Sequence, residues 1–287
     1  MRIEVNGVRL WFDTDGPVLV PAGREMRARP TVVLVHGGPA SYDHSYFKPD
    51  FCRLAEHAQL IYLDLRGHGR SEWGEPEAWT MEACADDIRA FCDAVGIERP
   101  IVLGHSMGVP VVLLYGARHA GHPAGLVAQS GFARWDLGRI VDGFRRFGGD
   151  EVAEIAARSY GGGTVTAEEW NRVYAVFGPR VPGADELARR KQNPSLRRRG
   201  SDVLGRTDIV DQLARIRCPT LVSVGELDPV TPLTAAEEIA AALPAGFARL
   251  VVLPNAGHFP WKDVPDRYWP LLGEFVDAVA RDYLSQR

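Results

Sequence analysis

The sequence lacks the features that mark several specialised classes of protein. Cysteines are few, no two of them form a C-x-x-C pair, and none has a histidine at metal-ligand spacing. No apolar stretch approaches the roughly 18 residues that cross a membrane, and the first residues hold no apolar segment typical of a signal peptide. We therefore expect a cytoplasmic protein without a membrane partner or a bound metal, with buried, reduced cysteines. The cysteines are Cys52, Cys84, Cys92 and Cys218.

An excess of charge of one sign is also absent. Lys and Arg number 33 and Asp and Glu number 37, so the net charge is only −4. This balance disfavours a dedicated nucleic-acid-binding protein, which is usually basic. Hydrophobic residues make up 46% of the 287 residues, which suffices for the core of one large domain or two small ones.

Short apolar runs rich in Val, Leu and Ile predict strands that are buried on both faces, as in a parallel sheet. The clearest helical pattern between them covers residues 80–95, where Thr80 can cap the start and Gly96 can end the helix. This alternation predicts an α/β fold with a mostly parallel central sheet flanked by helices. Asn6-Gly7 predicts an added antiparallel hairpin. The predicted parallel strands are residues 31–35, 60–64, 101–103, 126–128, 220–224 and 249–253.

The alternation of strands and helices stops between about Phe132 and Arg206. This stretch holds no convincing buried strand and is rich in Arg, Gly, Glu and aromatic residues. We interpret it as a mostly helical cap inserted over one face of the sheet. The predicted organisation is a core of residues 1–131 and 207–287, interrupted by a cap of residues 132–206.

Residues 101–108 read IVLGHSMG, a Gly-x-Ser-x-Gly motif between a predicted strand and an apolar helix. A sharp turn from strand to helix lifts the serine hydroxyl above the sheet. Such a turn requires small residues at Gly104 and Gly108, because a Cβ atom there would collide with the chain. The motif therefore predicts Ser106 as a nucleophile.

A serine hydroxyl needs a base to attack at neutral pH. His258 follows the last predicted strand, and Asp228 follows the strand before it. The order Ser106, Asp228, His258 is the order of a catalytic triad in this architecture. Glu226 in the same turn and Asp136 after the fourth buried strand are alternatives to Asp228.

Stabilisation of an oxyanion requires backbone donors near the serine. The loop HGGP at residues 36–39 follows the first predicted parallel strand, and the N–H groups of Gly38 and Met107 are the predicted donors. Pro39 has no N–H and cannot serve. His36 and His68, in Gly-rich loops, are expected to support those loops.

With these motifs in place, the chain resembles the α/β-hydrolase family, in its branch with a helical cap. The resemblance implies Ser106 as nucleophile, His258 as general base and acid, Asp228 as the carboxylate that orients it, and no metal or organic cofactor. A serine at the turn argues against the dehalogenase and epoxide-hydrolase branches, in which an aspartate attacks. The motifs are HGGP at 36–39, DLRGHGRS at 64–71, GHSMG at 104–108, GELDPVTP at 225–232 and NAGHFPW at 255–261.

Aromatic residues of the cap and of the segment after His258 are candidates for an apolar acyl or leaving-group pocket. The basic runs at 189–191 and 197–199 indicate either a solvated helix face or a rim that attracts anionic substrates. The pocket candidates are Trp135, Phe144, Trp170, Tyr174, Phe259 and Trp261.

The function expected first is a serine hydrolase that cleaves a small carboxylic ester, lactone or activated amide through an acyl-enzyme on Ser106. HGGP is similar to proline iminopeptidases and some acyl-homoserine lactonases, so a proline-iminopeptidase-type aminopeptidase is an alternative. That family usually has a GGSWG-type motif and paired cap glutamates, which Glu168-Glu169 matches only loosely. A non-catalytic ligand-binding protein on the same fold is the third hypothesis.

Overall fold

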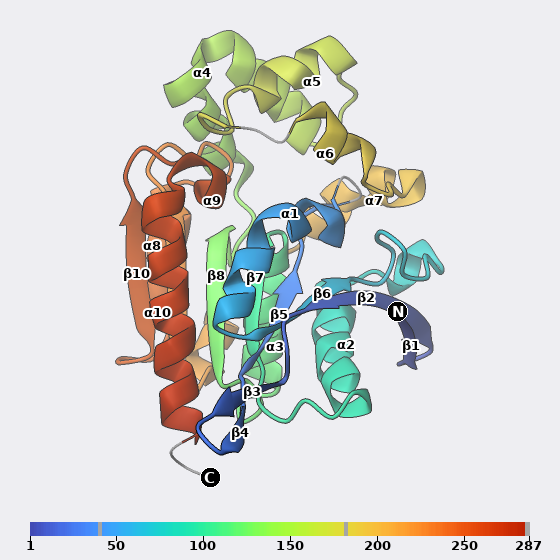
Figure 1. The fold of residues 1–287 in the computed structure, drawn as a ribbon. Helices are drawn as coiled ribbons and strands as arrows, with labels where there is room; N and C mark the ends of the chain where they lie inside the picture. The colour runs from blue at the N-terminus through green and yellow to red at the C-terminus, as the bar shows by residue number, and fades with distance from the viewer. Residues whose placement is uncertain (40–41, 181–182, 285–287) are drawn as a thin grey trace.

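A central eight-stranded sheet organises the molecule. The computed structural model describes residues 1–39, 42–180 and 183–284, without the side chains of residues 187, 197–199 and 282–284. Figure 1 shows the sheet with helices on both sides. The strand order is β1 (Arg2–Val5), β2 (Val8–Asp15), β6 (Gln59–Asp64), β5 (Thr31–Val35), β7 (Ile101–Ser106), β8 (Gly125–Gly131), β9 (Thr220–Gly225) and β10 (Ala248–Leu253).

The strands β6, β5, β7, β8, β9 and β10 pair in parallel. The antiparallel hairpin of β1 and β2 is added at the β6 edge of the sheet. The six predicted parallel strands and the Asn6-Gly7 hairpin are therefore confirmed. The hairpin turn has φ values of 47° and 71° at Asn6 and Gly7, which suit this dipeptide. A separate exposed hairpin, β3 (Leu19–Ala22) with β4 (Glu25–Ala28), is missing from the sequence-based expectations. Its side chains are almost all exposed, so it has no burial pattern to reveal it.

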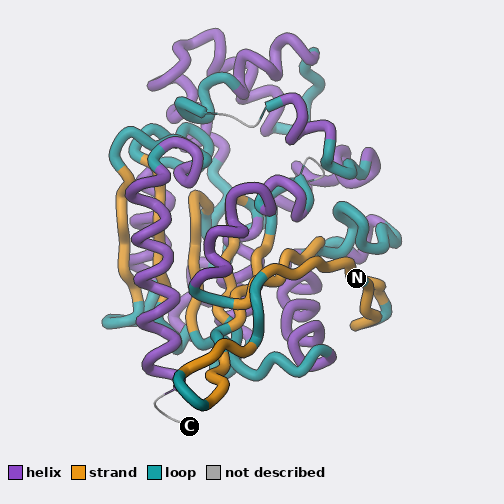
Figure 2. The backbone as a smooth tube through the Cα atoms, in the orientation of Figure 1, coloured by secondary structure: helices purple, strands orange, loops and turns teal. Residues whose placement is uncertain are grey.

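Alternate residues of the central strands enter two separate cores. Val33 and Val35 pack with one set of helices, whereas Val32 and Leu34 pack with the other. Figure 2 shows helices on both sides of the strands, which explains why the apolar runs are continuous. The first set is α2 (Met81–Ala94), α3 (Gly108–Arg118) and α8 (Leu233–Ala242); the second includes α1 (Lys48–Phe51) and α10 (Pro265–Leu284).

Between β8 and β9 the described residues form four α-helices, which make up the predicted helical insert. In Figure 1 the insert lies beyond the ends of the strands, so the expectation that it covers one face of the sheet is wrong. The boundaries at residues 132 and 206 stay a prediction. The helices are α4 (Leu137–Tyr160), α5 (Ala167–Tyr174), α6 (Ala184–Ala188) and α7 (Pro194–Gly205); the short α9 (Pro260–Asp263) follows β10.

The two ends of the insert meet in a short antiparallel pairing, which we call the neck. Arg134 and Asp208 form an isolated antiparallel bridge. The Trp135 N–H donates to the Thr207 carbonyl at 2.8 Å, and the Ile209 N–H donates to the Ala133 carbonyl at 3.0 Å. The chain therefore leaves and re-enters the core at nearly the same place.

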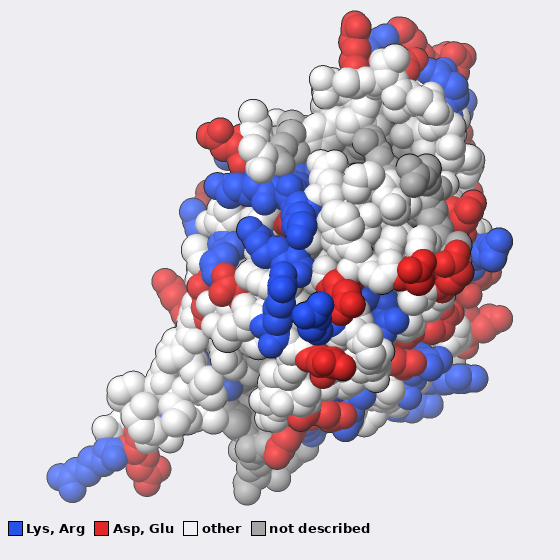
Figure 3. Space-filling model, turned by 90° about the vertical axis from the view of Figure 1, so that its right-hand side faces the viewer, with Lys and Arg blue, Asp and Glu red and all other residues white. Residues whose placement is uncertain are grey.

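Charge is unevenly spread over the surface. Figure 3 shows Lys and Arg side chains gathered in a band on the face that carries the β1 edge of the sheet.

No helix within the described residues is both long enough and apolar enough to cross a membrane.

Candidate active site

Ser106 stands at the turn between β7 and α3. It is the last residue of β7, and α3 begins at Gly108. Its φ of 54° lies in the left-handed region, which residues with a side chain rarely adopt. A Cβ atom on Gly104 would lie 2.4 Å from the carbonyl oxygen of Gly108, and one on Gly108 would lie 2.5 Å from that of Val35. Both glycines are therefore needed for the turn, as the motif predicts.

His258 and Asp228 meet beyond the ends of β10 and β9, the last two strands of the chain. His258 Nδ1 lies 2.9 Å from Asp228 Oδ2, and both side chains are buried. The other carboxylate oxygen of Asp228 accepts the N–H groups of Val230 and Thr231, at 2.9 and 3.0 Å. The Thr231 hydroxyl donates to Asp228 Oδ2 at 2.7 Å. These contacts hold the carboxylate in one orientation and present it to the imidazole.

The two alternative carboxylates are engaged elsewhere. Glu226 is exposed and accepts the N–H of Asn255 at 3.2 Å. Asp136 caps α4 by accepting the N–H of Arg139 at 3.0 Å. The geometry therefore favours Asp228 as the partner of His258.

The HGGP loop packs directly on the serine turn. A Cβ atom on Gly37 would lie 3.0 Å from Ser106 Cβ. A Cβ atom on Gly38 would lie 3.0 Å from Met107 Cε and 3.2 Å from His68 Nε2. The structure thus brings together Gly38 and Met107, the two residues predicted to donate to an oxyanion. Their role in catalysis remains a prediction.

A buried hydrogen-bond chain links the three loops of the site. The Gly37 N–H donates to the Tyr46 hydroxyl at 3.1 Å, and that hydroxyl lies 2.8 Å from His105 Nδ1. His105 Nε2 lies 2.9 Å from the carbonyl oxygen of His258. Because a carbonyl only accepts, Nε2 carries the proton, so Nδ1 accepts and Tyr46 donates. His105 therefore holds the HGGP loop and the His258 loop in a fixed relation.

Sequence reasoning missed Tyr46. It lies in a short 3-10 helix, η1 (His44–Tyr46), within none of the motifs, so no sequence signal could have identified it. Burial, reinforced by the nearby His258, holds the pKa of His105 well below its usual range. A neutral His105 is the form that this hydrogen-bond chain requires.

His36 and His68 support their loops, as expected. His36 Nδ1 lies 2.6 Å from the Gly37 carbonyl, and His36 Nε2 accepts the Leu65 N–H at 3.2 Å. His68 Nδ1 lies 2.9 Å from the carbonyl of Arg66. Burial lowers the pKa of both histidines, that of His68 to about 3.

The aromatic pocket candidates separate into three groups. Tyr174 and Phe259 lie near each other, with ring centroids 6.5 Å apart, and Phe259 lies 5.3 Å from the His258 ring. Trp261 packs against His105 inside the core, with ring centroids 4.9 Å apart. The others belong to the aromatic packing of the insert: Trp135, Phe144 and Trp170.

Phe177 is one of the cap aromatics but not one of the six residues named for the pocket, and it contacts His258 directly. Its ring centroid lies 5.5 Å from that of His258, and its carbonyl accepts the His258 N–H at 2.6 Å. The insert therefore contributes both a wall and a backbone anchor to the candidate base. No motif marks this position in the sequence.

The two basic runs lie in different kinds of structure. Residues 189–191 lie between α6 and α7 rather than on a helix face, and Arg190 places its guanidinium 3.9 Å from the Tyr42 ring centroid. Residues 197–199 lie in α7, and their side chains fall outside the described part of the chain.

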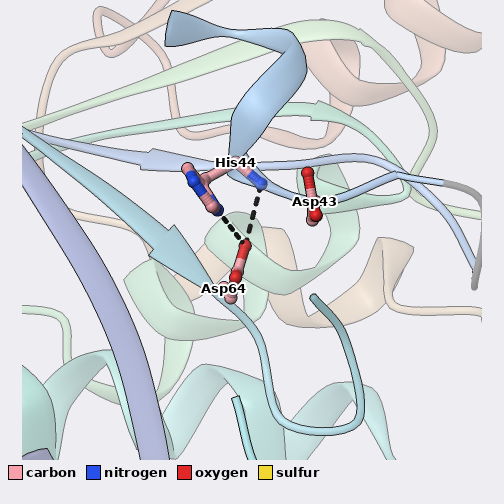
Figure 4. Close-up of side chains that lie close together, drawn as sticks. All are labelled: Asp43, His44 and Asp64. Atoms are coloured by element: carbon pink, nitrogen blue, oxygen red, sulfur yellow. Dashed lines mark hydrogen bonds and ion pairs between the residues drawn. The ribbon is translucent and has the colours of Figure 1, made fainter. Parts of the chain in front are cut away.

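Asp43, His44 and Asp64 form the one group in the described ranges with the composition of a metal site (Figure 4). His44 donates to Asp64 from both its N–H and its ring Nδ1, each at 2.8 Å. The Arg70 N–H donates to the other oxygen of Asp64, and the Lys191 N–H donates to Asp43, both at 2.8 Å. With these donors in place, the cluster is a hydrogen-bond network that ties the insert to the core.

Comparisons with known proteins identify the family and the fold. A family model described as "Alpha/beta hydrolase family" matches residues 32–271. The chain is 28% identical over 272 residues to "Putative carbamate hydrolase RutD" of Caulobacter sp. (strain K31), covering 86% of this chain and 95% of the relative.

Two solved structures have the same fold over nearly their whole length. A thermophilic esterase from Thermogutta terrifontis is 25% identical with a TM-score of 0.68, covering 98% of this chain and 99% of the esterase. The proline iminopeptidase of Mycobacterium smegmatis is 20% identical with a TM-score of 0.76, and the match covers 99% of both chains.

Proposed function

The chain belongs to the alpha/beta hydrolase family, and from that premise we propose that it is a serine hydrolase acting through an acyl-enzyme on Ser106. The observation that carries the proposal is the meeting of three features at the carboxyl ends of the parallel strands. These are the left-handed Ser106, the 2.9 Å contact of His258 with Asp228, and the Gly-rich loop against Ser106. Each feature alone has an ordinary structural explanation, whereas their combination is that of an acyl-transfer site.

In the first half of the proposed reaction, the hydroxyl oxygen of Ser106 attacks the acyl carbon and its proton passes to His258 Nε2. Asp228 holds the Nδ1–H side of the ring, so that Nε2 faces the serine. The carbonyl oxygen becomes an oxyanion, which the N–H groups of Gly38 and Met107 stabilise. The intermediate then collapses, and His258 gives its proton to the leaving group.

In the second half, water attacks the acyl-enzyme. His258 takes the proton of the water as the oxygen bonds to the acyl carbon, and it returns that proton to Ser106 when the ester bond to the enzyme breaks. The products are a carboxylic acid and the free enzyme.

We propose small carboxylic esters, lactones or activated amides as the substrate class. Phe177, Phe259 and Tyr174 surround the His258 side of the site with apolar surface. Such walls suit an apolar acyl or leaving group. The Caulobacter relative is named a putative carbamate hydrolase, which supports the inclusion of carbamates in the amide part of this class.

The aminopeptidase alternative would need cap carboxylates to bind a free amine. Glu169 is occupied otherwise, because it closes the capping box of α5 with Thr166 and pairs with Arg158. Glu168 lies in the exposed first turn of α5. These contacts favour the esterase-type proposal over the aminopeptidase. The decisive assay is Pro-p-nitroanilide, whose cleavage by an aminopeptidase would be lost on acetylation of its amine.

The direct test is hydrolysis of p-nitrophenyl acetate together with labelling by a fluorophosphonate. We expect Ser106→Ala to abolish both. Ser130→Ala is the matched control, because Ser130 is a buried serine that shares the left-handed backbone, with a φ of 46°, and it should keep both. Turnover and labelling that persist in Ser106→Ala would overturn the assignment. A wild-type protein that is never labelled would instead support the non-catalytic, ligand-binding alternative.

A further inference from the structure

A basic cavity opens on the surface where the β1 edge of the sheet meets the segment between α6 and α7. Its volume is about 220 Å³. It lies on the face where Lys and Arg side chains gather (Figure 3). The lining residues are Arg2, Arg9, Arg70, Ser71, Glu72, Trp73 and Lys191, and we call this cavity the basic pocket.

Cations outnumber carboxylates in the lining by four to one. Glu72, the single carboxylate, accepts the backbone N–H and the Nε–H of Arg9 at 3.2 and 3.3 Å. Glu4 lies opposite Arg9 in the register of the β1–β2 hairpin, but it does not line the pocket. The excess positive charge therefore faces the cavity without a matching number of protein anions.

Two of the cations are placed by aromatic rings. The Arg70 guanidinium lies over the Trp11 ring at 5.2 Å, and one of its nitrogens lies 3.2 Å from His44 Nε2. The Lys191 ammonium lies over the Trp73 ring at 5.4 Å. Cation–π contacts hold these charges in position without neutralising them. A guanidinium held in this way presents its remaining N–H groups as a fork that fits a carboxylate or phosphate.

We propose that the basic pocket binds a compact polyanion that carries two or more phosphate or carboxylate groups. Several like charges within one small cavity repel one another, and a polyvalent anion removes that repulsion. The pocket is separate from the centre around Ser106. None of its lining residues belongs to the site around Ser106, and three strand spacings of about 4.8 Å separate β2 from β7 across the sheet.

The pocket joins the core to the insert. Arg70 belongs to the core, where its N–H donates to Asp64, while Lys191 lies between α6 and α7 and its N–H donates to Asp43. An anion that contacts both cations therefore bridges the two parts of the chain. We expect such an anion to stabilise the folded protein against heat, because it binds the folded state alone.

The experiment compares pyrophosphate, citrate and chloride at equal ionic strength, with the Tm and the tryptophan fluorescence as readouts. Pyrophosphate represents phosphate ligands and citrate represents carboxylate ligands. We expect a saturable rise in Tm and a change in fluorescence, since Trp11 and Trp73 lie beside the cations. Whichever of the two anions gives the tighter binding identifies the source chemistry.

Two variants with the same change in net charge test the location. Arg2→Gln combined with Lys191→Gln should weaken binding at least tenfold. Arg24→Gln combined with Arg27→Gln, on the exposed β3–β4 hairpin, should leave it unchanged. Glu72→Gln should tighten binding, because it removes the one carboxylate of the lining.

An effect no larger than that of chloride would overturn the proposal, as would equal losses in the two double variants. If Arg2→Gln with Lys191→Gln fails to fold, weaker or unchanged binding in Glu72→Gln is the contrary result. Ser106→Ala should bind the anion as the wild type does. The anion site and the serine chemistry therefore stand or fall separately.

Discussion

The sheet and the helical insert restrict their sequences in different ways. Around Ser106 the constraint acts on the backbone, because an added Cβ atom at Gly104 or Gly108 would meet a main-chain carbonyl. The insert combines two kinds of position. A Cβ atom on Gly143 would lie 2.3 Å from the Pro229 carbonyl oxygen, whereas Gly205 and Gly149 have nothing within 4 Å of such an atom. The turn at Ser106 is therefore fixed by the backbone on both sides, whereas the insert has positions at which a side chain can be added freely.

The largest expected effect compares two aspartates, each downstream of a strand. We expect Asp228→Asn to lower kcat for p-nitrophenyl acetate by about 10³- to 10⁴-fold, because the amide no longer orients the neutral imidazole correctly. Asp136→Asn in the insert should change kcat less than about threefold, since asparagine caps a helix as well as aspartate does. Stopped-flow or plate assays measure kcat for both variants. Equal losses would remove the functional difference between the two regions.

The next effect compares two glycines. Gly104→Ala should destabilise the protein by about 3 kcal/mol or more, because its Cβ atom would lie 2.4 Å from a main-chain oxygen that cannot move freely. Gly205→Ala, at the end of α7, should stabilise the protein by about 0.5 kcal/mol through the helix preference of alanine. Urea unfolding measures both. A change below about 1 kcal/mol at Gly104 would contradict the backbone constraint.

Acid should weaken the core in particular, since all eight histidines lie outside residues 132–206. Burial lowers the pKa of His36, His68 and His105. Above pH 6.5 these histidines are neutral in both the folded and the unfolded chain. Below that pH the unfolded chain takes up protons that the folded chain does not, so stability falls as the pH falls, by up to about 1.4 kcal/mol per pH unit for each histidine.

His68→Asn isolates this effect, because asparagine can keep the donor to the Arg66 carbonyl while losing the titrating ring. We expect the slope of stability against pH between about 6 and 4 to become shallower by about 1.4 kcal/mol per pH unit. Urea unfolding at a series of pH values gives that slope. A slope equal to that of the wild type would show that His68 is not a source of acid sensitivity.

The smallest effect concerns the surface of the insert. Arg172 pairs with Glu151 between α5 and α4, and both side chains are exposed. Solvent and salt screen such a pair, so Arg172→Gln should leave the urea midpoint within experimental error. A clear shift of the midpoint would mean that the insert depends on its charges as well as on its aromatic packing.

The sequence predicts the core better than the insert for a physical reason. Strands buried on both faces leave continuous apolar runs, so all six parallel strands can be recognised, and β7 extends its run as far as Ser106. The pairing of His258 with Asp228 follows from strand order, because neighbouring parallel strands end at the same edge. Contacts that depend on side-chain packing leave no such pattern. Examples of such contacts are those of Tyr46 with His105 and of Phe177 with His258. The position of the insert beyond the strand ends depends on packing in the same way.

The neck separates the length of the insert from the path of the core. The two ends of the insert are joined by main-chain hydrogen bonds between Trp135 and Thr207 and between Ala133 and Ile209, which make no demand on the side chains in between. The entropy of closing a loop grows only slowly with its length. Residues 133–135 and 207–209 are therefore natural splice points for a longer or shorter insert. A foreign insert would also have to replace the Phe177 carbonyl that accepts the His258 N–H, because the insert anchors that loop from above the strand ends.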